Sequence, residues 1–342
     1  PRNTVSRVRI VGDWSEFEGT IKHTTKNIWL PLDMTKGMPK ATLDIAEGCT
    51  VTNVCKTMTI GKLTGKGSLA HAISNFQSQG TPSGNNTWNV GNSDLGDFTF
   101  DGTFTDAGGS NKAIFNKVGT CKMTVGGKSD HTGSTTIKEG ELCIKSGAQL
   151  GKGALTVNAG AVLSGVTTAS VPLINSSFAI NGTLRPGVIP TASLGTIYFN
   201  NKNVTIGATG VLLIRASRNN VSTNLGDIAT LTINGTIRIE VSESNNLQVG
   251  DEIRLWPATT QLAGNPQFDM QGGIIWDTTR ISEGVLVVKD IEMGIAPVMA
   301  DQDPRNVYDL TGRLVRRQAT ATSTEQLPAG IYIRGGRKVV VK

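Results

Sequence analysis

The sequence is poor in the residues that build metal centres. It has four cysteines and three histidines among 342 residues. No two cysteines form a C-x-x-C pair, and His23, His71 and His131 lie in separate segments, so the ligand spacing of a zinc site is missing. We therefore expect neither a metal site nor a cofactor.

Long apolar runs and a one-signed charge pattern are also missing. No apolar run approaches the roughly 20 residues that cross a bilayer, so we expect no membrane-spanning segment. The formal net charge is +6, but the residues from 301 onward hold eight basic and four acidic side chains, which leaves residues 1–300 near neutrality. Because those residues lack a basic face interleaved with aromatic side chains, we expect no nucleic-acid partner.

The chain begins at Pro1, without a Met and without the pattern of a signal peptide. This start predicts a mature product or a fragment of a longer protein. An upstream domain of the same protein is then a candidate partner, and a catalytic domain there would make this chain an accessory region.

Glycine is abundant, with 41 residues, whereas aromatic residues make up only 5% of the chain. Between residues 115 and 165, short segments of alternating apolar residues are bounded by Gly, Asn or Ser. The expected strands are residues 121–125, 135–137, 142–144, 155–157 and 162–163. Strands this short are stable where each turn of chain stacks on the next and buries a continuous core. We therefore predict an all-β fold, a single-stranded-solenoid parallel β-helix.

An antiparallel β-sandwich is the alternative fold. Asn-Gly pairs are strong turn signals, and apolar residues alternate on both sides of Asn234-Gly235. Taken alone, this pattern also fits hairpins in two packed sheets. The recurrence of such turns at a spacing of one solenoid turn favours the parallel stack.

The segment from about residue 59 to residue 165 resembles the autotransporter-associated β-strand repeat of secreted passenger regions. The matching pieces are IGKLTGKGSL, FDGTF, FNKVGTCKMTVGG, HTGSTTIKEGELCI and LGKGALTVNAGAVLSG. The two halves of the repeat pattern are filled by Lys117, Gly119, Met123, Val125 and Gly127, and by Thr132, Gly133, Thr135, Ile137, Gly140 and Leu142. Cys121 stands where the family has its second Gly. The resemblance implies a secreted protein or one at the outer-membrane surface.

Residues 250–288 resemble the closing segment of the same passenger family. The matching positions are Asp251, Leu255, Phe268, Trp276, Asp277, Thr278, Val285 and Leu286. The resemblance implies a cap at about residues 250–290. In such a cap Trp276 covers the open end of the core, which we prefer to a ligand-stacking role.

The character of the chain changes after Asp290. Residues 291–304 contain a small, Pro-containing linker, and the pieces VYDLTGRLV, LPAGIYI and KVVVK follow. These pieces resemble the end of the C-terminal sorting domain of the Bacteroidetes type IX secretion system, which implies an envelope or secreted protein of that phylum. The expected parts are a parallel β-helix at residues 1–290, a linker at 291–304 and a sorting-like β module at 305–342.

The sequence contains no recognisable set of catalytic residues. β-Helical lyases and glycoside hydrolases need paired carboxylates, or calcium ligands with an Arg or Lys base, and the acidic residues here are scattered singly. Arg185-Pro186-Gly187 comes nearest to the arginine pattern of pectate lyases but lacks its second Arg. We predict no catalytic residue, and leave a lyase or hydrolase site assembled across coils as the alternative.

The predicted function is a non-catalytic scaffold of adhesion type, with a polysaccharide or host glycan as its partner. The glycan-stacking candidates are Trp14, Trp29 and Trp88, which lie near polar turns. For each of them, packing in the core or in a turn is the preferred interpretation, and glycan stacking is the weaker one. Cys121 and Cys143 are 22 residues apart, about one solenoid turn, which leaves a disulfide or two buried free thiols; we predict the thiols.

Overall fold

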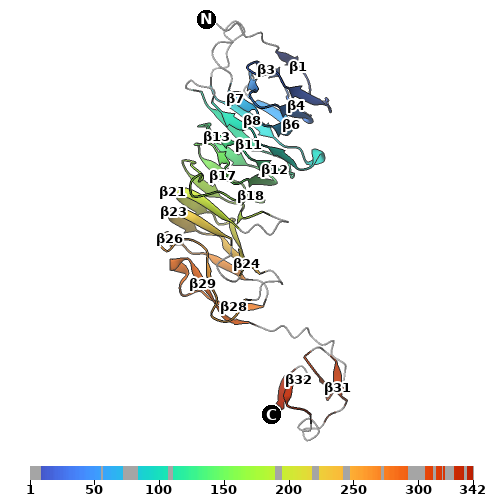
Figure 1. The fold of residues 1–342 in the computed structure, drawn as a ribbon, viewed down its shortest axis with the longest axis vertical. Helices are drawn as coiled ribbons and strands as arrows, with labels where there is room; N and C mark the ends of the chain where they lie inside the picture. Colours follow the sequence, from blue (N-terminus) through green and yellow to red (C-terminus); the bar gives the residue numbers. More distant parts are fainter. Residues whose placement is uncertain are drawn as a thin grey trace. The chain divides into compact units, whose positions relative to one another are not determined.

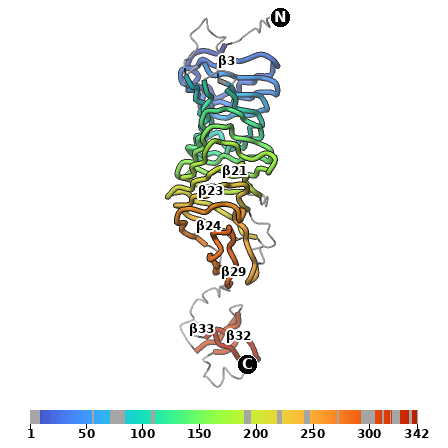
Figure 2. Tube along the Cα trace, turned by 90° about the vertical axis from the view of Figure 1, so that its left-hand side faces the viewer, coloured from blue at the N-terminus to red at the C-terminus, as the bar shows by residue number. Residues whose placement is uncertain are grey.

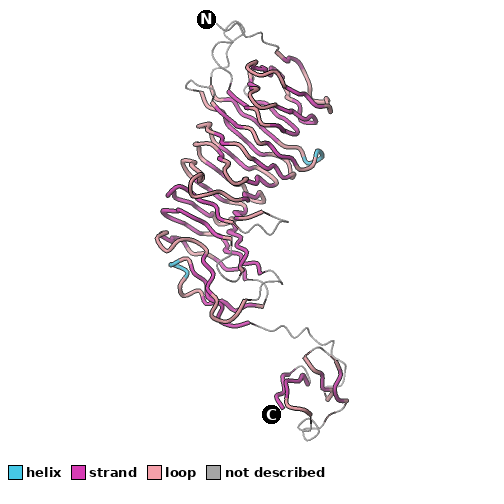
Figure 3. The backbone as a smooth tube through the Cα atoms, in the orientation of Figure 1, coloured by secondary structure: helices cyan, strands magenta, loops and turns pink. Residues whose placement is uncertain are grey.

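The computed structural model describes residues 9–54, 57–71, 84–106, 111–188, 195–217, 223–241, 247–270, 273–291, 305–310, 313–317, 319, 327–334 and 337–341. The chain divides into two compact units, residues 1–290 and 291–342. Strands dominate the described residues, and the helices among them are two short 3₁₀ helices, Ser93–Leu95 and Ile281–Glu283 (Figure 3). The prediction of an all-β chain is confirmed.

The first unit is a stack of coils in which successive strands occupy three faces (Figures 1 and 2). Face 1 contains β1 (Ile10–Gly12), β3 (Trp29–Met34), β5 (Thr50–Asn53), β7 (Ser68–His71), β10 (Thr103–Thr105), β13 (Lys128–Ser129) and β16 (Gln149–Leu150). Face 2 contains β8 (Asn86–Val90), β11 (Ala113–Lys117), β14 (Thr135–Ile137), β17 (Leu155–Val157), β19 (Phe178–Ile180) and β26 (Gln261–Gly264). Face 3 contains β2 (Thr20–His23), β9 (Phe98–Phe100), β12 (Lys122–Val125), β15 (Glu141–Ile144), β18 (Val162–Gly165), β20 (Thr183–Pro186), β22 (Val211–Ala216), β24 (Thr236–Val241) and β27 (Gln267–Met270).

Four long strands turn a corner and contribute to two faces each. β4 (Met38–Ile45) and β6 (Thr57–Gly65) run from face 2 into face 3. β21 (Thr196–Ile206) and β23 (Asn224–Ile233) run from face 1 into face 2, and their pairing has register shifts between Tyr198 and Val204. The corner is thus made within a strand, without a separate loop.

Neighbouring coils pair in parallel on all three faces. On face 3, β12 pairs with β15, β15 with β18, and β18 with β20, each in parallel. The parallel β-helix is therefore confirmed and the antiparallel sandwich is wrong. Asn234-Gly235 makes the corner between β23 and β24, and each of these strands pairs with strands of adjacent coils.

The core is a set of inward-facing columns of aliphatic side chains. Alternation along each strand sends every second residue inward, and the parallel register places these residues above one another. One column on face 3 consists of Met123, Leu142, Leu163, Leu184, Leu212 and Ile237, each of them 0% exposed. Burying one such side chain stabilises a fold by about 1.5–3 kcal/mol, so the stacking of coils supplies the stability that single strands lack.

The segment predicted to form the cap contains a small three-stranded sheet at one end of the stack, in which β25 and β29 are antiparallel (Figure 1). Its strands are β25 (Glu252–Arg254), β28 (Ile274–Asp277) and β29 (Val285–Ile291). The backbone N–H of Leu225 donates to the carbonyl oxygen of Leu255 at 2.8 Å and joins this segment to a coil. Trp276 is 7% exposed, and Trp256, which the sequence did not single out, is 0% exposed.

The second unit is a four-stranded antiparallel sheet. Its order is β31-β30-β32-β33, with β30 (Val307–Tyr308), β31 (Leu314–Arg316), β32 (Gly330–Arg334) and β33 (Arg337–Val341). Val307, Leu327, Tyr332 and Val341 form its small buried cluster. The predicted linker at 291–304 lies outside the described residues, apart from Ile291.

Candidate functional site

The three tryptophans predicted to stack on glycans lie in different surroundings. Trp14 is half-buried; its ring meets Phe17 edge-on with centroids 5.2 Å apart, and its Nε1 donates to the carbonyl oxygen of Val11 at 2.9 Å. Trp29 is half-buried at the start of β3. Trp88 is 0% exposed in β8, so it has no ring face open to a glycan and is withdrawn as a candidate.

A polar cluster lies on the outward side of face 3. The parallel register places Cys143 of β15, Ser164 of β18 and Arg185 of β20 directly above one another in three successive coils. Nη2 of Arg185 lies 2.8 Å from Oε1 of Glu141, and the Ser164 hydroxyl donates to the same oxygen at 2.5 Å. The Arg185 and Glu141 side chains are 15% and 19% exposed, so this ion pair is largely shielded from water.

Arg215 of β22 is a second guanidinium near this cluster. Its Nη2 donates to the carbonyl oxygen of Val188 at 3.3 Å. Burial lowers the pKa of Arg215, the like charge of Arg185 lowers it further, and Glu240, its register partner in β24, acts in the opposite direction. The two arginines are therefore close enough to repel each other.

Both arginines keep a buried donor without an acceptor. Nε of Arg185 and Nε of Arg215 are inaccessible to solvent and form no hydrogen bond. A buried N–H without an acceptor costs about 1–3 kcal/mol, and more on a charged group. Within the described part of the chain, no carboxylate forms an ion pair with Arg215.

Arg238 of β24 shows the contrasting situation on the same face. Its Nε lies 2.6 Å from Oδ2 of Asp269, which is its register partner in β27. The Arg238 and Asp269 side chains are 39% and 37% exposed, so the pair is more open to water. Face 3 thus carries one arginine in an ion pair with its register partner, Arg238, and one that forms none among the described residues, Arg215.

The three described cysteines are buried thiols, and Cys55 lies outside the described residues. Cys49, Cys121 and Cys143 are free, and burial raises the pKa of Cys49 and of Cys143. The register pairs Cys143 with Thr124, three residues beyond Cys121. Three residues along a strand span about 10 Å, beyond the roughly 7 Å that a disulfide bridges between Cα atoms. The disulfide alternative is therefore wrong.

Lys117 is a buried cation at the corner after β11. It is 0% exposed, and its Nζ donates to the carbonyl oxygens of Val118, Gly119 and Glu139 at 2.9, 2.7 and 3.2 Å. Burial lowers the pKa of Lys117, while Cys121 acts to raise it. Since Glu139 belongs to the next coil, the ammonium group ties two corners together, which is a structural role.

His131 is buried as a neutral base. Its Nε2 lies 2.9 Å from the hydroxyl of Thr135, which itself donates to the carbonyl oxygen of Leu150 at 3.0 Å. The hydroxyl therefore accepts from Nε2, and Nδ1 is left as a buried acceptor without a partner. Burial lowers the pKa of His131. The ring packs against Gly151, where a Cβ would lie 2.5 Å from Cε1 of His131.

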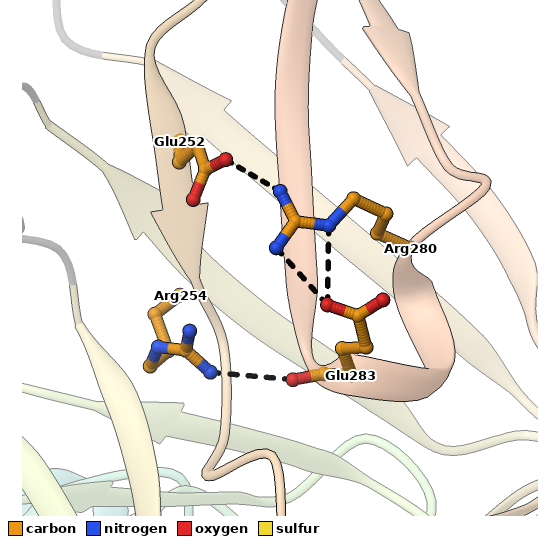
Figure 4. A network of polar contacts seen from close by, with 4 residues as sticks. All are labelled: Glu252, Arg254, Arg280 and Glu283. Carbon is orange, nitrogen blue, oxygen red and sulfur yellow. Dashed lines mark hydrogen bonds and ion pairs between the residues drawn. The ribbon is translucent and has the colours of Figure 1, made fainter.

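The small sheet after the last coils carries an exposed ion-pair network (Figure 4). Nη1 of Arg280 bonds to Glu252 at 2.5 Å and Nη2 of Arg280 to Glu283 at 3.0 Å. Arg254 donates to the carbonyl oxygen of Glu283 at 3.3 Å. The network links β25 to the 3₁₀ helix before β29, and exposed pairs of this kind contribute little to stability individually.

The described residues form neither a metal-binding group nor a membrane-crossing helix. They contain no group of three or more His, Cys, Asp or Glu side chains arranged to hold a metal ion. They also contain no helix of the length and hydropathy that would cross a membrane.

Comparison with known proteins adds no family assignment. The sequence matches no protein-family model, and it has no significant match among curated proteins. The resemblances to the autotransporter repeat and to the type IX sorting domain therefore stay predictions, whereas the β-helix is established by the structure.

Sequence reasoning missed the arginine cluster. The sequence singles out Arg185 only as part of a lyase-like tripeptide, and it does not single out Arg215. The available signal is that each occupies an outward position in a strand whose inward neighbours are aliphatic, as in TLRP and VLLIRA. Their proximity depends on the register between stacked coils, which cannot be read from a single sequence.

Proposed function

We propose that this chain is a non-catalytic scaffold displayed outside the cell, where its outward faces contact glycans. The observation that carries the proposal is the continuous parallel register of face 3, from β2 to β27, around an aliphatic core. A stack of this kind presents outward side chains at a fixed spacing of about 4.8 Å between coils, over an extended surface of the kind that repeat proteins use for binding. Trp14 and Trp29, both half-buried, remain predicted contacts on its first coils.

The test determines whether the chain lies outside the cell and whether it cleaves the glycans that it binds. Intact cells that produce the protein are treated with a protease, and loss of the chain without cell lysis supports display. The purified chain is then incubated with pectins and other glycans, and binding without new reducing ends or unsaturated products supports the scaffold. A chain protected from protease in intact cells, or one that binds no glycan, contradicts the proposal.

One observation favours the alternative of a lyase or hydrolase. Glu141, Arg185 and Arg215 come from three strands of face 3, so they form the kind of cluster across coils that such an enzyme needs. A lyase would use a base to remove a proton beside a uronate carboxylate, and this cluster holds a carboxylate, Glu141, together with the guanidinium groups of Arg185 and Arg215. Unsaturated products that vanish in Arg215→Gln would establish this activity in place of the scaffold.

A further inference from the structure

His131 lies where the hydrogen-bonded ladder of face 1 is interrupted. The strands β1, β3, β5, β7 and β10 form one sheet, whereas β13 and β16, of two residues each, form a separate sheet. Between β10 and β13 irregular contacts replace strand pairing. The backbone N–H of Phe104 donates to the hydroxyl of Ser129 at 3.0 Å, and the N–H groups of Asp130 and His131 both donate to the carbonyl oxygen of Phe104. A stretch with so few ladder bonds is of the kind that opens locally.

The imidazole ring of His131 has no place for a second proton in the closed coil. The ring is 0% exposed and meets Phe104 edge-on, with ring centroids 6.1 Å apart. Its Nε2 donates to the hydroxyl of Thr135 at 2.9 Å, while its Nδ1 is inaccessible to solvent and has no hydrogen-bond partner. Protonation would put an N–H on Nδ1, and a buried donor without an acceptor destabilises the closed form.

The neighbouring carboxylates do not supply the missing acceptor. Asp106 and Asp130 favour the protonated ring, but burial outweighs them, so the pKa of His131 lies below its ordinary value. Oδ1 of Asp106 accepts from the N–H of Ala113 at 2.7 Å, and Oδ2 accepts from the N–H and the hydroxyl of Thr132 at 2.9 and 2.6 Å. The cations on β11, on β13 and at the corner after β16 are Lys117, Lys128 and Lys152.

We propose that protonation of His131 opens face 1 locally between β10 and β16, while the coils on either side stay closed. In the open form the Nδ1–H group bonds to water, which removes the cost of burying it. Opening uncovers Phe104 and Phe115, which are buried and whose rings stack with centroids 4.2 Å apart. An acidic medium would therefore expose an apolar surface within the stack of coils. This device is independent of any glycan contact.

The direction and size of the effect follow from proton linkage. His131 has its ordinary pKa of 6.5 where it is exposed, and a lowered pKa in the closed coil. The closed form is therefore fully favoured above about pH 6.5 and loses stability as the pH falls towards the lowered pKa. Uptake of one proton should raise the opening constant by up to about tenfold between about pH 7.5 and about pH 5.5.

The experiment follows hydrogen exchange of the full chain by peptide mass spectrometry at these two pH values, corrected for the intrinsic exchange rates. Peptides that cover residues 127–135 and 149–153 are compared with peptides from β22 and β24, which pair in a regular ladder. His131→Gln and His131→Leu remove the titrating ring. His23→Gln is the matched control, because His23 is also buried but lies in the first coil, with its Nε2 2.8 Å from the carbonyl oxygen of Ile28.

We expect protection at residues 127–135 and 149–153 to fall about tenfold at the lower pH in the wild type and in His23→Gln. Protection there should be the same at both pH values in the two His131 variants, and the peptides from β22 and β24 should change little in any protein.

Three results would overturn the proposal. An equal loss of protection in all coils would show that acid acts on global stability alone. A local loss that persists in both His131 variants would assign the effect to another group. Unchanged protection at residues 127–135 and 149–153 would show that the coil stays closed. If neither His131 variant folds, the distribution of exchange along the wild-type chain still separates local from global opening.

Discussion

Gly235→Ala tests whether the corners of the coils are limited by close backbone stacking. Gly235 follows Asn234 at the corner between β23 and β24, and its φ lies outside the left-handed region. Alanine is therefore allowed by the backbone. From the entropy of the unfolded chain alone, this change would stabilise the fold by about 0.4–1 kcal/mol.

The contacts of the corner predict the opposite sign. A Cβ on Gly235 would lie 2.1 Å from the carbonyl oxygen of Gly210 and 2.4 Å from that of Gly207, both backbone atoms of the preceding coil. Relieving this overlap needs a displacement of about 1 Å, since real Cβ contacts are about 3.0 Å or longer. The same corner holds the hydrogen bonds from Asn234 to Ile206 and from Thr236 to Gly210, both 2.9 Å. Weakening two such bonds and straining the coil should cost about 2–4 kcal/mol.

The measurement is urea unfolding followed by tryptophan fluorescence, with Gly160→Ala as the matched control. Gly160 has a φ of +80°, and a Cβ added there would have no atom within 4 Å, so alanine meets backbone strain without a clash. We expect a loss of about 1–2 kcal/mol in the control and a larger loss in Gly235→Ala. A neutral or stabilising Gly235→Ala would refute the stacking argument.

Three further predictions concern buried and exposed polar groups. His131 is neutral in the fold and protonates when unfolded, near its ordinary pKa of 6.5, so the free energy of unfolding should fall as the pH drops from about 6.5 towards the lowered folded pKa. In urea titrations at several pH values, His131→Gln should flatten this dependence, and an unchanged slope would contradict the prediction. Cys121 and Cys143 should escape alkylation in the native chain and react on unfolding, as peptide mass spectrometry would show; rapid native labelling would contradict their burial. Arg280→Ala should lower the thermal midpoint less than Gly235→Ala does, by an amount that shrinks in high salt; a large, salt-independent loss would show that the network of Figure 4 determines stability.

Much of the fold was predictable because its signals are local. The strands expected at residues 135–137 and 155–157 are β14 and β17 with the same limits, and the expected strand at 121–125 is β12, one residue shorter. The alternation of apolar residues, and the glycines that bound each segment, indicate the limits of a strand within a few residues. Asn234-Gly235 was ambiguous because a hairpin and a coil corner need the same local turn, and only the pairing of β23 and β24 with other coils distinguishes them.

The candidate site was much less predictable. The polar turns near Trp88 make it a weak glycan-stacking candidate beside the preferred role in packing, and the alternation of β8 turns it into the core. The arginine cluster went unnoticed because its members are 30 positions apart in the sequence, at Arg185 and Arg215. Singly placed charges on outward positions look like ordinary solvated side chains until the register is known.

The sequence by itself determined an all-β chain of short alternating strands, and its recurrent turns favoured a stacked parallel coil over the antiparallel sandwich. Only the tertiary structure decided which outward residues meet. The length of a coil varies, since Lys122 pairs with Glu141, 19 residues on, whereas Thr236 pairs with Gln267, 31 residues on. Inward columns tolerate such variation because any aliphatic residue fills them. An ion pair does not, because it depends on the register of particular side chains.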